Sequence, residues 1–275
     1  MSPYRASAPF TEDWGHFGFE IDEGVATVTF RRPERLNALT FDVYADFRDL
    51  LTEIEHREDV AVLVVTGEGD GFCSGGDVNE IIGALQEADS RTLLEFTRMT
   101  GAVVERMRRV PIPIIAAVNG VAAGAGAVIA LAADMRLMAA TSSFQFLFTR
   151  VGLAGADMGS AYLLPRVVGL GRASEILLLG ERITPAEAVA MGLTSRVVED
   201  GRLLGESREL ARRLATGPTL ALGATKLALS RELDMDLGSS IEFEAFTQAL
   251  LMTTEDHAEF YRAFTGKRPP EWSGR

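Results

Sequence analysis

Cysteine and histidine are scarce in this sequence. A single cysteine, Cys73, occurs among 275 residues, so no internal disulfide can form, and such sparse use is typical of a reducing compartment. The N-terminus lacks the basic start and apolar core of a signal peptide. The three histidines lie far apart, without the spacing of metal ligands. We therefore expect a cytoplasmic protein with no metal site.

Positive charge is also in deficit. The chain has 27 Lys and Arg residues against 39 Asp and Glu residues, a net charge of −12. Nucleic-acid binding needs clustered basic side chains, and an anionic membrane surface attracts the same kind of cluster. The composition therefore predicts a protein with neither nucleic acid nor membrane as a partner.

Long hydrophobic runs are interrupted. The uncharged stretch over residues 110–133 is long enough to span a bilayer, but Pro111, Pro113 and the Asn119-Gly120 pair break it. We interpret it as a buried strand over residues 112–118, a glycine turn, and a buried helix that ends near residue 133.

Common catalytic and nucleotide-binding motifs are missing. No Gly-x-Gly-x-x-Gly follows a strand, and neither a Gly-Lys-Ser/Thr phosphate loop nor a Gly-x-Ser-x-Gly elbow occurs. Cys73 has no histidine near it in the sequence, so we interpret it as a small loop or core residue. A dinucleotide enzyme, a phosphate-loop enzyme and a serine hydrolase thus have little support.

Strand and helix patterns alternate up to about residue 200, and only helical patterns follow. A hairpin is expected to turn at Asp22-Glu23-Gly24, and Thr40 to cap a helix that runs to about residue 57. Breaks in the helical part are expected at Gly217-Pro218 and at Gly238. The predicted organisation is a flexible N-terminal arm (1–15), an α/β core (16–200) and a C-terminal helical region (201–275).

Two strand–loop–helix junctions could carry chemistry. They read "VVTGEGDGFCSGGDVNEI" and "IAAVNGVAAGAGAVIAL". Each delivers glycine-rich backbone to the start of a helix, where backbone N–H groups have no intrahelical partner. Two such N–H groups together can bind a developing oxyanion. The alternative is that these small residues only allow tight packing.

Together with "RRPERLNALT", these loops give the chain its resemblance to a known family. The sequence resembles the enoyl-CoA hydratase/isomerase (crotonase) family in five blocks that occur in the family's order. They are "GVATVTFRRPERLNALT", "FCSGGDVNEI", "PIPIIAAVNGVAAGAGAVIALAADMRLMAA", "VGLGRASEILLLGERITPAEAVAMGLTSRVV" and "TTEDHAEFYRAFTGKRPPEW".

The resemblance implies an α/β fold, a crotonase-like spiral of ββα turns with a C-terminal helical region that builds trimers or hexamers. It implies an acyl-CoA thioester substrate, with no cofactor beyond the CoA that the substrate carries. The oxyanion hole would use the backbone N–H groups of Gly76 and Ala125. The residues expected to contact CoA are Leu36, Ala38, Leu39, Gly75, Asp77, Asn79 and, from a neighbouring subunit, Lys267.

The sequence departs from the hydratase pattern at the acids. Hydratases of this family use two glutamates around a water, and their positions here hold Val128 and Phe148, which we expect to line the substrate pocket. Neither side chain can move a proton. Hydratases also often have lysine at the position of Asn79. The usual two-glutamate hydration therefore cannot run in this chain.

Asp157, in "GLAGADMG", is the candidate catalytic residue. Similar segments in isomerases and in a dehalogenase of the family have an aspartate there, if one inserted residue is allowed. Burial among Leu153, Met158 and an expected wall of Phe144, Phe146 and Phe148 would raise its pKa. The alternative is that Asp157 only caps a helix that starts near Met158.

These observations favour an enzyme that stabilises a thioester enolate and moves protons with Asp157 alone, as an isomerase or as a hydratase. A non-catalytic acyl-CoA-binding homologue is the alternative from another class. A CoA-thioester dehalogenase or hydrolase has less support, because the histidine that assists dehalogenation has no counterpart in "TRMTGAVVERM".

Overall fold

The computed structural model describes residues 9–274 and contains a six-stranded sheet with the order β1-β2-β3-β5-β7-β10. The first two strands form an antiparallel hairpin, and each later neighbour pairs in parallel. The strands are β1 (Phe17–Asp22), β2 (Val25–Phe30), β3 (Val62–Gly67), β5 (Ile114–Val118), β7 (Met135–Ala139) and β10 (Arg196–Val198). The predicted hairpin is confirmed, since Asp22 pairs with Val25 across Glu23 and Gly24, both at positive φ.

A second sheet of very short strands lies beside the first, with the order β4-β6-β8-β9. Its strands are β4 (Gly71–Cys73), β6 (Val121–Ala123), β8 (Ser143–Gln145) and β9 (Arg182–Ile183). Strands β3, β5 and β7 of the large sheet are each followed by one strand of the small sheet and then by helix, which gives the expected spiral of ββα turns. The sequence reading was wrong in treating β4 and β6 as loop and turn, because strands this short show no periodicity.

The helices of the core begin at clear caps. Thr40 caps α1 (Phe41–Ile54) by accepting the Val43 N–H, and Asp89 caps α3 (Ser90–Arg109). Helix α1 ends at Ile54, three residues earlier than expected, and a turn follows it. The other helical segments of this part are η1 (Pro33–Arg35), η2 (Val78–Ile82), α2 (Gly83–Leu85) and α4 (Ala125–Ala132).

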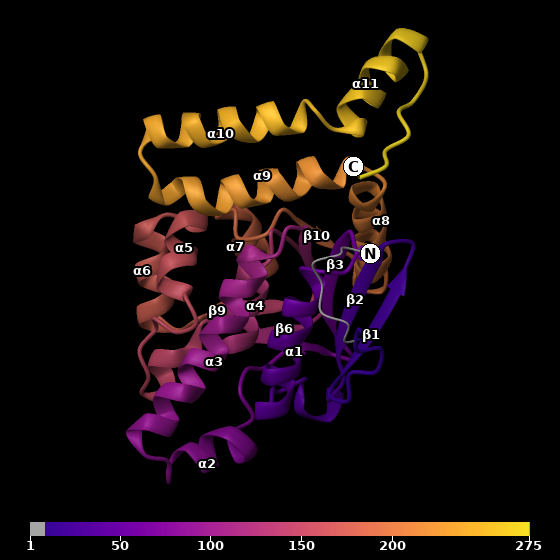
Figure 1. The fold of residues 1–275 in the computed structure, drawn as a ribbon. Coiled ribbons are helices and arrows are strands. Elements are labelled where there is room, and N and C mark those ends of the chain that lie inside the picture. Colours follow the sequence, from indigo (N-terminus) through magenta and orange to yellow (C-terminus); the bar gives the residue numbers. More distant parts are fainter. Residues whose placement is uncertain (1–8, 275) are drawn as a thin grey trace.

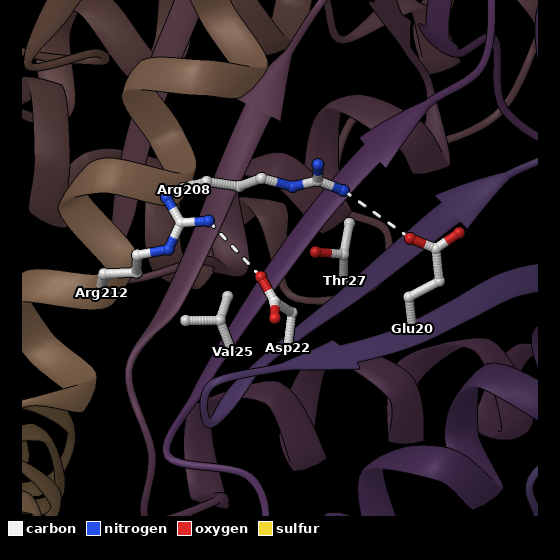
Figure 2. A pocket seen from close by; sticks show the side chains of 6 residues that line it. All are labelled: Glu20, Asp22, Val25, Thr27, Arg208 and Arg212. Atoms are coloured by element: carbon white, nitrogen blue, oxygen red, sulfur yellow. Dashed lines mark hydrogen bonds and ion pairs between the residues drawn. The ribbon is translucent and has the colours of Figure 1, made fainter.

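Each face of the large sheet packs against helices. One face joins α1, α3, α4 and the small sheet in the main apolar core, and the other is covered by α8 (Leu203–Ala215). Figure 2 shows where α8 meets the outer edge of this second face, around a cavity of about 200 Å³. There Arg212 pairs with Asp22 at 3.4 Å, and Arg208 lies 3.8 Å from Glu20, so the arginine charges are already balanced.

The chain after β8 is mainly helical (Figure 1). It comprises η3 (Leu147–Val151), α5 (Ser160–Val168), α6 (Leu170–Leu179), α7 (Pro185–Ala190), η4 (Asp200–Arg202), α8, α9 (Thr219–Arg231), η5 (Glu232–Asp234), α10 (Leu237–Leu251) and α11 (Glu255–Gly266). The predicted break at Gly238 is wrong: Gly238 lies in the first turn of α10. The break falls earlier, since Asp236 caps that helix. A further break before α11, where Thr254 is the cap, was not predicted.

The predicted N-terminal arm lies partly outside the described residues, which begin at residue 9. In its remaining part, Thr11 donates two hydrogen bonds to the Glu53 carboxylate, and Trp14 stacks on Phe17 with ring centroids 5.7 Å apart. These contacts fix residues 11–14 on the core. Within the described residues, no helix combines the length and the apolar character needed to cross a membrane.

A buried ion network attaches the C-terminal helices to the core. The Asp134 carboxylate binds Lys226 of α9 at 2.9 Å and Arg108 of α3 at 3.0 Å, and it accepts the Ile114 N–H at 2.8 Å. Burial lowers the pKa of Lys226 to about 8, although the Asp134 charge opposes that shift. The Asp134 carboxylate therefore compensates the charges of both Lys226 and Arg108.

We predict that Asp134→Asn lowers the free energy of unfolding by about 3–5 kcal/mol, because it leaves buried positive charge uncompensated. Denaturant unfolding at one fixed protein concentration measures this. The control is Glu95→Gln, which breaks an exposed i,i+4 pair with Arg91 and should cost less than about 1 kcal/mol. Equal losses in the two variants would contradict the assignment.

Candidate active site

The loop that precedes α1 is joined to the loop that follows β4. Leu39 and Gly76 form a parallel bridge, in which the Leu39 N–H donates to the Gly75 oxygen at 2.8 Å and the Leu39 oxygen accepts the Asp77 N–H at 2.8 Å. Closer to β4, the Ser74 N–H donates to the Leu36 oxygen at 2.9 Å. These bonds hold two segments about 40 residues apart in sequence as one unit.

The loop after β4 also touches the start of α4. Gly75 has φ +101°, and a Cβ atom there would lie 3.1 Å from the Ala123 oxygen and 3.5 Å from the Ala125 nitrogen. At Gly126 a Cβ would lie only 2.1 Å from the Cys73 oxygen. The two backbones approach this closely only because glycine has no side chain. The structure therefore brings the predicted residues Gly76 and Ala125 together.

Both of these residues present a free backbone donor. Ala125 is the first residue of α4, where N–H groups have no intrahelical partner, and in the bridge at Gly76 only the neighbouring Gly75 oxygen and Asp77 N–H are used. Within residues 9–274, neither the Gly76 nor the Ala125 N–H donates a hydrogen bond. Adjacent unpaired N–H groups of this kind suit a developing oxyanion.

Two asparagines, the buried Asn37 and the partly buried Asn119, hold the loops in place, and the sequence pattern did not predict this role for either. Asn37 accepts the Arg32 N–H at 2.8 Å and donates to the Gly71 oxygen at 2.7 Å. Asn119 donates to the same Gly71 oxygen at 3.1 Å and accepts the Gly67 N–H at 3.1 Å. Each amide thus replaces backbone pairing at the point where a strand becomes a loop.

Asp157 lies between η3 and α5 and is not the cap of α5. That helix begins at Ser160, two residues later than expected, with Gly159 as its N-cap and no side-chain cap. The Asp157 side chain instead accepts the adjacent Met158 N–H at 2.9 Å. The capping alternative for Asp157 is therefore wrong.

Burial raises the pKa of the Asp157 carboxyl above its usual value, and the Met158 N–H only partly opposes the shift. The phenol pKa of Tyr44 in α1 is raised first by burial and then by the neighbouring Cys73 and Asp157. A carboxyl whose pKa is raised by burial is typical of an acid–base site, so Asp157 stays a candidate catalytic residue.

A comparison with protein families matches residues 20–275 to the family described as Enoyl-CoA hydratase/isomerase. The chain belongs to this family. A curated relative, 1,2-epoxyphenylacetyl-CoA isomerase of Escherichia coli (strain K12), is 36% identical over 255 residues, which cover 93% of this chain and 97% of the relative.

Further relatives agree with this assignment. The (E)-benzylidenesuccinyl-CoA hydratase of Thauera aromatica is 34% identical, with 93% of this chain and 98% of that protein covered. A protein of Streptomyces coelicolor A3(2) with a known crystal structure is 59% identical in sequence to this chain. The two structures match with a TM-score of 0.98 over the full length of both chains. The fold is therefore the crotonase fold of the enoyl-CoA hydratase/isomerase family.

The remaining residues predicted from the family pattern differ in their surroundings. Val128 is fully buried in α4, and Phe148 is buried in η3, so both residues predicted at hydratase glutamate positions lie in apolar surroundings. Leu36 is 40% exposed, whereas Ala38 and Leu39 are buried beside it. The exposed residue at the lysine position is Asn79, in η2.

The Asp77 side chain is engaged by its own loop, and its expected contact with CoA stays a prediction. Its carboxylate accepts the Asn79 and Glu80 N–H groups at 2.9 and 3.0 Å, and it lies 3.2 Å from the Arg32 guanidinium. The Glu80 N–H, then the Asn79 N–H, then Arg32 lower its pKa. In this chain the Asp77 side chain therefore fixes the loop after β4.

Lys267 is not brought to the loops within one chain. It directly follows α11, which Figure 1 places at the end of the molecule opposite α2.

The Cys73 thiol is buried and its pKa is raised to about 12, so it cannot serve as a thiolate nucleophile. No group of three or more His, Cys, Asp or Glu residues able to hold a metal occurs within residues 9–274.

A larger cavity of about 480 Å³ lies elsewhere, between the N-terminal segment and α1. Its lining includes Trp14, His16, Arg32, Asp42 and Glu80 but neither Gly76, Ala125 nor Asp157. His16 is engaged there by Asp46 at 2.6 Å, and Arg32 by Glu80 at 2.6 Å. Two of its polar side chains thus already have partners, and the predicted site residues lie elsewhere, at the loops.

We predict that Gly126→Ala abolishes binding of acyl-CoA esters and costs about 1–3 kcal/mol of stability, because the added methyl forces Cys73 and its loop away from α4. Calorimetric titration with acetyl-CoA and thermal unfolding measure the two effects.

The matched control is Gly101→Ala in α3, where a Cβ meets nothing within 4 Å. It should leave binding intact and stabilise the protein by up to about 1 kcal/mol, as alanine does in a helix interior. Normal binding by Gly126→Ala protein would show that the close approach of the two backbones is not needed.

Proposed function

We propose that this chain is an acyl-CoA enzyme in which the Gly76 and Ala125 N–H groups bind the thioester oxygen and Asp157 moves the proton. The observation that carries the proposal is the pair of free backbone donors on two loops in close contact, and a carboxyl whose pKa is raised by burial supports it. A thioester oxygen that accepts hydrogen bonds from two N–H donors can carry negative charge. A C–H bond next to the carbonyl then becomes more acidic.

The Asp157 carboxylate would remove that proton, and the negative charge would move to the thioester oxygen as an enolate. Returning the proton to another carbon of the conjugated system completes a double-bond isomerisation. One carboxylate suffices for this, because the same group is first a base and then an acid. The apolar side chains of Val128 and Phe148 would keep water away and strengthen the interaction of the oxyanion with the N–H groups.

Hydration is the second candidate, with Asp157 and one positioned water in place of two glutamates. It is supported by the relatives: at similar identity one is named an isomerase and another a hydratase. A non-catalytic acyl-CoA binder is the rival from another class. Incubation with butanoyl-CoA in deuterated water distinguishes an enzyme from a binder. An enzyme with a working base exchanges the proton next to the thioester, and a protein that only binds the ester does not.

The CoA part of the substrate would lie along the loop of Leu36, Ala38 and Leu39 and along residues 75–79. No further cofactor enters this reaction, because CoA arrives with the substrate. Lys267 of a neighbouring subunit would supply the cation for the CoA phosphates, since α11 lies far from the loops of its own chain.

We predict that Asp157→Asn lowers kcat by about 10²–10⁴-fold, the usual contribution of a general base, while acyl-CoA binding survives. Asparagine keeps an oxygen for the Met158 N–H and removes a charge that burial disfavours, so the melting temperature should stay equal or rise slightly. Steady-state kinetics, calorimetric binding and thermal unfolding test these three points.

The control is Asp49→Asn, which changes an exposed aspartate on α1 and should leave all three quantities unchanged. The pH profile adds a second check. The base works only when it is ionised, so kcat/KM of the wild-type enzyme should decrease as the pH is lowered. Because burial raises the pKa of Asp157, the midpoint of this decrease should lie above the usual aspartate value of 3.8. An active Asp157→Asn enzyme would remove Asp157 from the mechanism.

We also predict that the chain forms a trimer or hexamer through its C-terminal helices. Large apolar side chains on these helices are at least half exposed in the single chain: Leu229, Leu233, Leu237, Ile241, Phe246, Leu250, Met252, Tyr261 and Phe264. Such a surface is costly in water and typical of an interface. Light scattering at micromolar concentration should give three or six times the mass of one chain, and a monomer would refute the prediction.

A further inference from the structure

Ser160 is the first residue of α5, and its hydroxyl is not used on that helix. The residue is fully buried, yet α5 has no side-chain cap. A serine at the start of a helix is normally the residue whose hydroxyl accepts an N–H of the first turn. Here the hydroxyl bonds instead to the preceding loop, which contains Asp157.

Three hydrogen bonds of Ser160 close this loop. Its Oγ atom accepts the Asp157 N–H at 3.0 Å and donates to the Gly155 oxygen at 2.7 Å. Its own backbone N–H donates to the Asp157 oxygen at 2.8 Å. One serine therefore fixes the backbone of Asp157 at both its N–H and its carbonyl, and ties it to the residue two positions earlier.

The backbone held in this way is strained. Met158 has φ +49°, a left-handed conformation that residues other than glycine rarely adopt, and Gly159 follows with φ +87°. The Met158 N–H donates to the Asp157 carboxylate at 2.9 Å. Such a conformation costs free energy and persists only where the surrounding structure holds it, and residues of this kind cluster at functional sites.

Both ends of the loop are packed against helices of the core. A Cβ at Gly155 would lie 2.5 Å from the Leu177 oxygen of α6, and a Cβ at Gly159 would lie 3.8 Å from the Val104 side chain of α3. The segment between these glycines is fixed by its own hydrogen bonds. Loss of the serine hydroxyl would take a partner from the Gly155 oxygen and from the Asp157 N–H, and the segment would lose its fixed conformation.

We propose that Ser160 is a positioning residue for Asp157. By fixing the Asp157 backbone and the strained Met158 beside it, the Ser160 hydroxyl sets the direction of the carboxylate that moves the proton. The inference rests on the proposed function, because it takes Asp157 as the base. A misplacement of about 1 Å can cost about 10²-fold in rate, so a hydroxyl that touches no substrate can still decide turnover.

The test measures deuterium exchange into butanoyl-CoA by Ser160→Ala protein, at a temperature below its melting transition. The maximal exchange rate per folded protein should fall about 10- to 100-fold, because the carboxylate is no longer held in place. The butanoyl-CoA concentration that gives half of this rate should stay within about twofold, the pattern of a lost transition-state interaction. A role in folding alone would leave the rate per folded protein unchanged.

Ser142→Ala is the matched control. The Ser142 hydroxyl is almost as deeply buried and donates to the Ala139 oxygen at 2.7 Å, at the end of β7. Its removal also takes a partner from a backbone oxygen and should therefore lower the melting temperature as well. The exchange rate per folded protein should nevertheless equal that of the wild type.

The double variant Ser160→Ala/Asp157→Asn shows whether Ser160 acts through Asp157. Adding Ser160→Ala to Asp157→Asn protein should slow the residual exchange by less than about twofold, because the base that it positions is already gone. A full further loss on that background would overturn the inference. A normal exchange rate in Ser160→Ala protein with Asp157 intact would do the same.

The Asp157→Asn variant by itself keeps the two proposals apart. If exchange is lost in Asp157→Asn protein and normal in Ser160→Ala protein, the proposed function stands and only the role of Ser160 falls. If Asp157→Asn protein exchanges at the wild-type rate, Asp157 is not the base, and the proposed mechanism falls together with the positioning role.

Discussion

The close contact between two glycine-rich backbones is the constraint on which the site depends. The loop after β4 lies against the start of α4 so tightly that a Cβ at Gly126 would meet the Cys73 oxygen at 2.1 Å. This contact sets the free N–H groups of Gly76 and Ala125 side by side. Backbone donors held by a packed core do not reorganise when charge develops, which is why such sites stabilise oxyanions well.

Val128 and Phe148, which the family resemblance predicts to stand where hydratases have glutamates, are both buried and apolar. The acid–base chemistry we propose therefore falls to a single carboxyl on another segment. Burial decides the character of Asp157, because desolvation outweighs the one hydrogen bond from Met158.

Much of the fold follows from local signals in the sequence. The Asp22-Glu23-Gly24 turn and the Thr40 cap each involve hydrogen bonds between residues a few positions apart, so the residue types alone predict them. The two glycine loops could likewise be identified from their motifs. The exceptions are β4 and β6, which exist only because distant strands supply their pairing.

The sequence by itself determined the family, the glycine loops and the lone Asp157, because each is a pattern of residue types. Only the tertiary structure decided what these residues do together. It showed that Asp157 does not cap α5, that the Asp77 side chain fixes a loop, and that burial raises the pKa of Asp157. The physical reason is that burial and unpaired hydrogen-bonding groups depend on contacts between residues far apart in the chain, which no local pattern encodes.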